Sequence, residues 1–226
     1  MDDFADIKCR GHRGHDVHPV ELAQQQDRGA SLPPLTDCAP WVIGLCGAAG
    51  AGKSTVAATL AELGYTRIRI SDPLKSMIRA LLAAAGVAED EMERLVEGDL
   101  KELPHSALGG VSPRLAMQTL GTEWGRVYMG SEFWVSVARR KIRATLAAGG
   151  RVVVEDCRFP NEARAIKAPG NRGGELWLVT GRGGISGGHR TESNLPQLAP
   201  DLFLNNSGCF ADLRAAVLAE VLVQNA

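Results

Sequence analysis

The segment Gly-Ala-Ala-Gly-Ala-Gly-Lys-Ser at residues 47–54 constrains the fold more than any other feature of this sequence. It fits the pattern G-x-x-x-x-G-K-[ST], and it lies between an apolar run at 41–46 and a segment with helical periodicity at 53–63. Glycines let backbone N–H groups turn inward around phosphate oxygens, and the N-terminus of the following helix adds partial positive charge. The sequence therefore predicts a strand–loop–helix unit that binds a nucleotide.

The side chains of this loop have distinct expected roles. Lys53 is predicted to reach the β- and γ-phosphates of ATP, and the Ser54 hydroxyl to hold Mg²⁺. The alternative is a glycine-rich turn with an exposed lysine. The residues predicted to bind ATP are Gly47, Ala48, Gly50, Ala51, Gly52, Lys53, Ser54 and Thr55.

Strand-like and helix-like segments alternate after residue 40. Apolar runs predict strands at 41–46, 65–70, 151–155, 175–180 and 201–205, and periodic segments predict helices that begin near residues 53, 72, 113, 131 and 210. This alternation predicts an α/β fold, a three-layer parallel sheet with helices on both faces. We expect residues 1–39 to be a flexible leader and 40–226 to be one domain. Within that domain we expect a helical insertion at 86–111 and a lid at about 181–197.

The balance of charge limits the classes of partner. The 25 Lys and Arg residues face 26 Asp and Glu residues, and the net charge of −1 gives no basic footprint for long nucleic acids or an anionic membrane. No apolar stretch approaches the length of a membrane span. The five cysteines have no paired spacing, and Cys46 and Cys157 lie in or beside apolar runs, as buried free thiols do. We therefore expect a cytoplasmic protein with a small-molecule partner.

Carboxylates and an arginine follow the strand expected at 151–155. Asp156 stands where a carboxylate beside a phosphate-binding loop orients Mg²⁺ or its waters. Arg158 lies at the carboxyl end of a parallel strand, where such sheets bind ligands, and its planar guanidinium suits a phosphate. The alternatives are a helix cap for Asp156 and a surface ion pair for Arg158.

A third cluster occupies residues 114–126. Arg114 and Gln118 are four residues apart and share one helix face, which places a phosphate-binding cation beside an amide that can hydrogen-bond a base. Trp124 and Trp134 could stack on a base. The alternative is that both tryptophans anchor the core.

Two further segments complete the predicted site. Asp72 follows the second strand and Lys75 lies one helical turn later, so we expect both to meet the acceptor. The alternative for this pair is a helix cap and a solvated lysine. The lid carries charged and polar residues, namely Arg182, His189, Arg190, Thr191 and Glu192. Its cations are expected to close over the transferring phosphoryl group, and the alternative is a polar loop without that role.

Together these segments resemble the phage-type deoxynucleoside monophosphate kinases of the P-loop kinase group. The resemblance rests on GAAGAGKST at 47–55, SDPLK at 71–75, RLAMQTLGTEWGR at 114–126, VVVEDCRFPNEA at 152–163, HRTES at 189–193 and DLFLNN at 201–206. It implies a P-loop kinase domain at 40–226, with ATP on the loop and a deoxynucleotide facing it under the lid. It also implies the host cytoplasm as location if the chain is phage-encoded. The family's lid often has a serine where this chain has Thr191.

The resemblance implies roles for single residues as well. It places at the site Arg114, Gln118, Arg126, Asp156 and Arg158. Glu162, four residues after Arg158, is predicted as a further substrate contact. The expected reaction transfers the γ-phosphate of ATP, with Mg²⁺, to a deoxynucleoside 5′-monophosphate. In that reaction Lys53, Arg158 and a lid arginine, preferably Arg182, share the developing charge.

Two alternative functions stay open. One is a kinase of another small acceptor, such as dephospho-coenzyme A. The other is a P-loop ATPase or binding module without a small-molecule acceptor, which the near-neutral charge and the segment 114–126 disfavour. Apolar faces around 131–147 leave a homodimer open.

Overall fold

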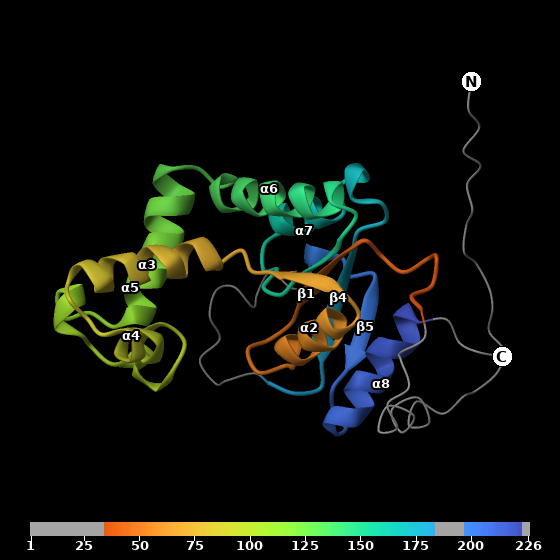
Figure 1. The fold of residues 1–226 in the computed structure, drawn as a ribbon, viewed down its shortest axis with the longest axis horizontal. Coiled ribbons are helices and arrows are strands. Elements are labelled where there is room, and N and C mark those ends of the chain that lie inside the picture. Colours follow the sequence, from red (N-terminus) through yellow and green to blue (C-terminus); the bar gives the residue numbers. More distant parts are fainter. Residues whose placement is uncertain (1–33, 184–196, 223–226) are drawn as a thin grey trace.

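The computed structural model describes residues 34–183 and 197–222, and this part of the chain contains a five-stranded parallel sheet (Figure 1). The strands are β1 (Val42–Cys46), β2 (Tyr65–Ile68), β3 (Arg151–Val154), β4 (Glu175–Thr180) and β5 (Leu202–Asn205). Their order across the sheet is β2-β3-β1-β4-β5, and every neighbouring pair is parallel. All five predicted strands are confirmed.

Helices cover both faces of the sheet (Figure 1). The helices α2 (Lys53–Glu62) and α8 (Phe210–Val221) pack on one face, and α6 (Phe133–Ala147) and α7 (Pro160–Ile166) on the other. Because successive strand residues point to opposite faces, Val153 packs with the α2 side and Val152 and Val154 with the α6 side. The predicted three-layer α/β fold is confirmed.

The chain between β2 and β3 begins with a helical lobe that has a small core of its own (Figure 1). The lobe contains α3 (Asp72–Ala84), α4 (Glu89–Val96), the 3₁₀ turns η2 (Asp99–Glu102) and η3 (Ser106–Leu108), α5 (Pro113–Thr119) and the π-helical η4 (Leu120–Tyr128). Its buried core residues are Ile78, Leu82, Leu95 and Val96. The helical insertion predicted at 86–111 is therefore the middle of a longer one.

Two predicted helix starts have different outcomes. The Ser112 hydroxyl accepts the N–H of Leu115 at 3.2 Å, and Pro113 takes the first helical position, as predicted. The cap predicted at Ser131 is wrong, because α6 begins at Phe133 and the residue before it, Glu132, makes no side-chain cap bond.

The folded part of the chain begins earlier than the predicted domain start at residue 40. Leu35 forms an isolated antiparallel bridge with Leu222, and the Thr36 N–H donates to the Val221 carbonyl at 2.8 Å. Ala39 is buried in the core on the α2 side of the sheet. The apolar side chain of Leu35 thus ties this segment to the end of α8. Residues 1–33 of the predicted leader lie outside the described residues.

We expect the segment 35–38 to contribute to stability. A chain that begins at Ala39 should have a free energy of unfolding about 1–2 kcal/mol lower than one that begins at Pro34, because it lacks the apolar contacts of Leu35 and the two backbone hydrogen bonds of Thr36. Urea unfolding of the two chains measures the difference. Equal midpoints would show that the bridge to Leu222 contributes nothing.

The fold bears on two further predictions, the absence of a membrane span and a possible homodimer. Within 34–183 and 197–222, no helix has the length and apolar character needed to cross a membrane. The apolar face of α6, which left a homodimer open, packs against the sheet through Trp134, Ala138 and Ile142. A homodimer stays a prediction, without support from that face.

The two cysteines beside the sheet are free thiols in the core, as predicted. Burial raises the pKa of Cys46 to about 11 and raises the pKa of Cys157 well above its ordinary value. Both thiols therefore stay protonated and unreactive near neutral pH.

Candidate active site

The phosphate-binding loop joins β1 to α2 at the carboxyl edge of the sheet, and β1 lies between β3 and β4. Gly47 and Gly52 have φ angles of 138° and 106°, which residues other than glycine rarely adopt. A Cβ on Gly47 would lie 2.4 Å from the Val179 carbonyl oxygen, and one on Gly52 would lie 2.5 Å from the side-chain nitrogen of Asn206. Both positions require glycine, as a backbone cradle for phosphate does.

Lys53 folds back onto this loop. Its Nζ donates to the carbonyl oxygens of Gly47 at 2.8 Å and Ala48 at 2.7 Å, which differs from the alternative of an exposed lysine on a simple turn. Ser54 follows in the first turn of α2 and is exposed, so its hydroxyl is accessible to a metal ion. A glycine cradle, a held ammonium and an accessible hydroxyl fit a nucleotide phosphate with Mg²⁺.

The segment after β4 lies against the phosphate-binding loop. A Cβ on Gly183 would lie 2.3 Å from the Ala49 carbonyl oxygen. The neighbouring Arg182 donates from Nη2 to the Gly208 carbonyl at 2.5 Å, just before α8. Arg182 is therefore near the loop, and its catalytic role stays a prediction. The other lid residues, His189, Arg190, Thr191 and Glu192, lie outside the described residues.

Asn206, directly after β5, supports the phosphate-binding loop from a distant part of the sequence. Its buried side-chain amide donates to the Ala51 carbonyl at 2.9 Å, and its backbone N–H donates to the Thr180 carbonyl at 2.7 Å. The sequence analysis assigned no role to this residue. The signal that could have found it is its place in the DLFLNN segment at 201–206.

We expect Asn206→Ala to weaken the binding of ATP by about tenfold, since the variant leaves the Ala51 carbonyl without its donor. Titration with a fluorescent ATP analogue measures the dissociation constant. Asn205→Ala is the matched control, because within the described residues the exposed Asn205 side chain accepts only the nearby Ser207 N–H. The dissociation constant of this variant should not change. Equal affinity in both variants would contradict the supporting role of Asn206.

Asp156 binds backbone at the entrance to the helical lobe. Its Oδ1 accepts the N–H of Ile70 at 2.7 Å and its Oδ2 accepts the N–H of Ser71 at 3.0 Å, one residue before α3. This resembles the capping alternative more than a dedicated metal ligand. Each carboxylate oxygen keeps a further lone pair that can accept a Mg²⁺-bound water. Its predicted role toward Mg²⁺ stays a prediction.

Glu155, the other carboxylate after β3, is a buried counter-ion. Its Oε1 accepts Arg67 Nε at 2.5 Å and its Oε2 accepts Arg69 Nε at 3.1 Å. Burial favours a raised pKa for Glu155, but the hydrogen bonds and charges of the two arginines outweigh it and hold the pKa below its ordinary value. Both oxygens therefore serve to neutralise Arg67 in β2 and Arg69 just after it, a role that the sequence analysis missed.

Glu162 connects two arginines that the sequence analysis placed at the site. Its Oε2 accepts the N–H groups of Arg158 at 2.7 Å and Phe159 at 3.0 Å, and its Oε1 accepts Arg126 Nη2 at 2.5 Å. The Arg126 guanidinium also lies 3.7 Å from the centroid of the Phe159 ring. Glu162 is 3% exposed, and burial raises its pKa above the ordinary value. In this conformation Glu162 holds the Arg126 guanidinium and the backbone at Arg158, and its predicted contact with substrate stays a prediction.

Arg158 is the exposed member of this group. It follows β3, the strand that pairs with β1, so it lies on the same sheet edge as the phosphate-binding loop. Within the described residues its guanidinium makes no hydrogen bond or ion pair, unlike the surface ion pair considered as the alternative. A cation in this position can meet a phosphate.

The acceptor residues predicted on the lobe are engaged with neighbouring carboxylates. Lys75 Nζ lies 2.8 Å from each carboxylate oxygen of Glu97, and the exposed Arg114 pairs with Glu102. Gln118 is half-buried one turn further along α5. Lys75 and Arg114 are thus held on the lobe, whereas Arg126 is held against α7.

The two tryptophans pack together. Trp134 is 3% exposed, and its Nε1 donates to the Gly121 carbonyl at 2.9 Å. The half-buried Trp124 lies 5.3 Å from Phe133 and 5.9 Å from Trp134, between ring centroids. This is the core-anchor arrangement, and a base could not stack on Trp134 without displacing it. Stacking on Trp124 stays a prediction.

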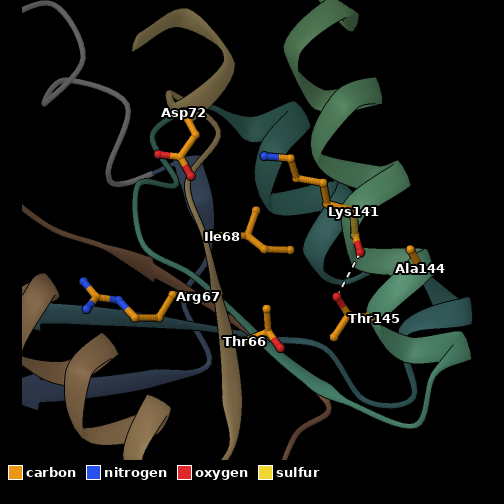
Figure 2. A pocket seen from close by; sticks show the side chains of 7 residues that line it. All are labelled: Thr66, Arg67, Ile68, Asp72, Lys141, Ala144 and Thr145. Atoms are coloured by element: carbon orange, nitrogen blue, oxygen red, sulfur yellow. Dashed lines mark hydrogen bonds between the residues drawn. The ribbon is translucent and has the colours of Figure 1, made fainter. Parts of the chain in front are cut away.

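A cavity of about 320 Å³ lies between the edge strand β2 and α6 (Figure 2). Figure 2 shows the Asp72 and Lys141 side chains on it, with the Arg67 guanidinium pointing away from Lys141. Of the predicted site residues that the structure describes, only Asp72 lines this cavity. Asp72 is the first residue of α3, after the N-cap Ser71, so the capping alternative is wrong for it.

Comparison with known proteins gives a distant likeness. No family model and no curated protein matches the chain. Among solved structures, TT1252 from Thermus thermophilus aligns with a TM-score of 0.42 and 22% identity, over 80% of this chain and 96% of that one. Dephospho-CoA kinase from Campylobacter jejuni aligns with a TM-score of 0.42 and 14% identity, over 79% and 94%. At these values neither likeness bears on activity or substrate.

Proposed function

We propose that this protein transfers the γ-phosphate of ATP to a small acceptor. The observation that carries the proposal is the phosphate-binding loop, in which Lys53 is held against the backbone of Gly47 and Ala48. Arg158 follows a neighbouring strand at the same sheet edge, and Arg182 lies beside the loop. A phosphoryl transfer site needs this kind of placement, because positioning and charge neutralisation supply most of its catalysis.

Each residue at the site would have its own role in phosphoryl transfer. Lys53 would bind the β- and γ-phosphates, and Ser54, with Asp156 acting through a water, would hold Mg²⁺. Bound Mg²⁺ supplies charge neutralisation at the phosphates. Arg158 and Arg182 would orient the transferring group and share its developing charge. Glu162 would keep Arg158 and Arg126 in fixed positions through its three hydrogen bonds.

For the acceptor we propose a deoxynucleoside 5′-monophosphate. The resemblance of residues 114–126 and 152–163 supports this choice, as do cations at both the sheet edge and the lobe. A phosphate acceptor is already ionised near neutral pH, so the reaction needs no general base. Both Asp156 oxygens accept backbone N–H groups, which is compatible with a reaction that needs no general base.

One observation favours the second candidate, a hydroxyl acceptor such as that of dephospho-coenzyme A. Such an acceptor needs a group that takes its proton. Within the described residues the Asp72 carboxylate makes no hydrogen bond or ion pair, and it stands four residues after the last residue of β2, at the start of α3. Asp72 is therefore the carboxylate available for that role.

An ADP-release assay tests the proposal. Wild-type protein with ATP and Mg²⁺ is assayed with each of the four deoxynucleoside monophosphates, their ribose counterparts and dephospho-coenzyme A. We expect turnover with more than one deoxynucleoside monophosphate. Turnover with dephospho-coenzyme A alone would establish the second candidate, and ADP release that no acceptor stimulates would indicate an ATPase module.

A further inference from the structure

Three cations from three elements gather in the helical lobe. Lys75 belongs to α3, Lys101 to η2 and Arg114 to α5, and α5 packs against both α3 and η2. Glu97 binds Lys75 through both oxygens at 2.8 Å, and Glu102 binds Arg114. Lys101 forms no hydrogen bond or ion pair within the described part of the chain, and the sequence analysis did not single it out.

The charges around Lys101 do not balance. Three cations face Glu97 and Glu102, and Arg79, which also pairs with Glu97 at 3.3 Å, is matched by Glu93, so the group carries a net charge of +1. Lys101 is half-buried, and burial, together with the charges of Lys75 and Arg114, lowers its pKa, while Glu97 and Glu102 oppose this in part. A lysine that repels its neighbours without a partner of its own is a feature of functional sites more than of stabilising networks.

We propose that Lys75, Lys101 and Arg114 form an anion-binding subsite that takes a phosphate group of the acceptor, with Lys101 as its central residue. The inference rests on the proposed function. Arg114 and Glu102 are 48% and 61% exposed, so a phosphate can draw Arg114 from Glu102 at little cost. The guanidinium fork can then bind two phosphate oxygens while Lys101 supplies a point charge.

Binding titrations without ATP test the subsite directly. The probes are inorganic phosphate, the deoxynucleoside monophosphates and dephospho-coenzyme A, and the variants are Lys101→Met and Lys101→Arg. We expect Lys101→Met to weaken acceptor binding by about tenfold or more, and Lys101→Arg to stay within about threefold of wild type. Arg94→Met, which removes an exposed pair with Asp99 in the same lobe, should leave binding unchanged.

A pH series separates binding from a structural role. Acceptor binding to the wild type should weaken as pH rises through the lowered pKa of Lys101, because the neutral amine loses its attraction for phosphate. In Lys101→Arg this step should disappear, since arginine stays charged. Thermal unfolding of Lys101→Met should be unchanged or shifted upward, because the variant removes a repelled cation. If that variant does not fold, the pH series on wild type and Lys101→Arg decides.

The outcomes distinguish this subsite from the proposed function. Lys101-dependent binding of a phosphate ester without any phosphoryl transfer would leave the subsite standing and overturn the function. Transfer with equal dissociation constants in wild type and Lys101→Met would overturn the subsite and leave the function. If only inorganic phosphate depends on Lys101, the subsite does not serve the acceptor. The probe that shows the dependence, a deoxynucleoside monophosphate or dephospho-coenzyme A, identifies the source of the phosphate.

Discussion

Lys53→Ala should lower kcat for phosphoryl transfer by at least about a hundredfold and leave the free energy of unfolding within about 0.5 kcal/mol of wild type. The lysine ammonium lies against the Gly47 and Ala48 carbonyls in the loop, outside the apolar core. Its removal therefore takes a charge from the phosphates without opening a cavity. Because that charge acts most strongly on the transition state, the loss should appear mainly in kcat and less in KM.

Steady-state kinetics with the best acceptor and urea unfolding of the same preparation measure the two quantities. Arg143→Ala is the matched control, since it removes an exposed cation of α6 that has no hydrogen bond or ion pair within the described residues. Its kcat should equal that of the wild type. A Lys53→Ala protein that turns over at a near-normal rate would overturn the assignment of the phosphate-binding loop.

The sheet and the loop were predictable because their signals are local. A central parallel strand such as β3 is buried on both faces, so it appears in the sequence as an uninterrupted apolar run. The loop at 47–54 combines a fixed spacing with glycines at positions where a Cβ would collide with backbone or a side chain. Neither inference depends on which distant segment packs nearby.

The lobe was harder to predict, because its helices bury only narrow stripes. In α3 the residues Ile78 and Leu82 are buried, but the apolar Met77 and Leu81 are 40% and 51% exposed. Apolar periodicity therefore overstates how much of this helix faces a core. The apolar face of α6, by contrast, was compatible with a dimer and packs on the sheet.

The roles of the carboxylates could not be read from their positions in the sequence. Glu155 and Asp156 are adjacent, yet Glu155 neutralises Arg67 and Arg69 while Asp156 binds backbone at the start of α3. Those partners lie more than 80 residues away in the chain. Whether a carboxylate after a strand becomes a ligand, a cap or a counter-ion depends on such long-range neighbours.

Glu162→Ala should lower the free energy of unfolding by about 3–5 kcal/mol, the range for removal of one partner from a buried ion pair. The carboxylate is 3% exposed, and its loss leaves Arg126 without an acceptor and the N–H groups of Arg158 and Phe159 unsatisfied. Urea unfolding measures the change. The matched control is Glu93→Ala, which breaks an exposed ion pair with Arg79 and should shift the unfolding midpoint by no measurable amount.

A second variant of Glu162 tests its effect on kcat. Glu162→Gln keeps the volume of the side chain, but its amide has a single acceptor oxygen for the donors that the two carboxylate oxygens now share. We expect the variant to fold, with a kcat about tenfold or more below wild type, because Arg158 is no longer fixed beside the phosphate-binding loop. Kinetics at a temperature well below its unfolding transition exclude a loss of folded protein. A normal kcat in a folded Glu162→Gln protein would show that the arginines do not depend on Glu162 for their positions.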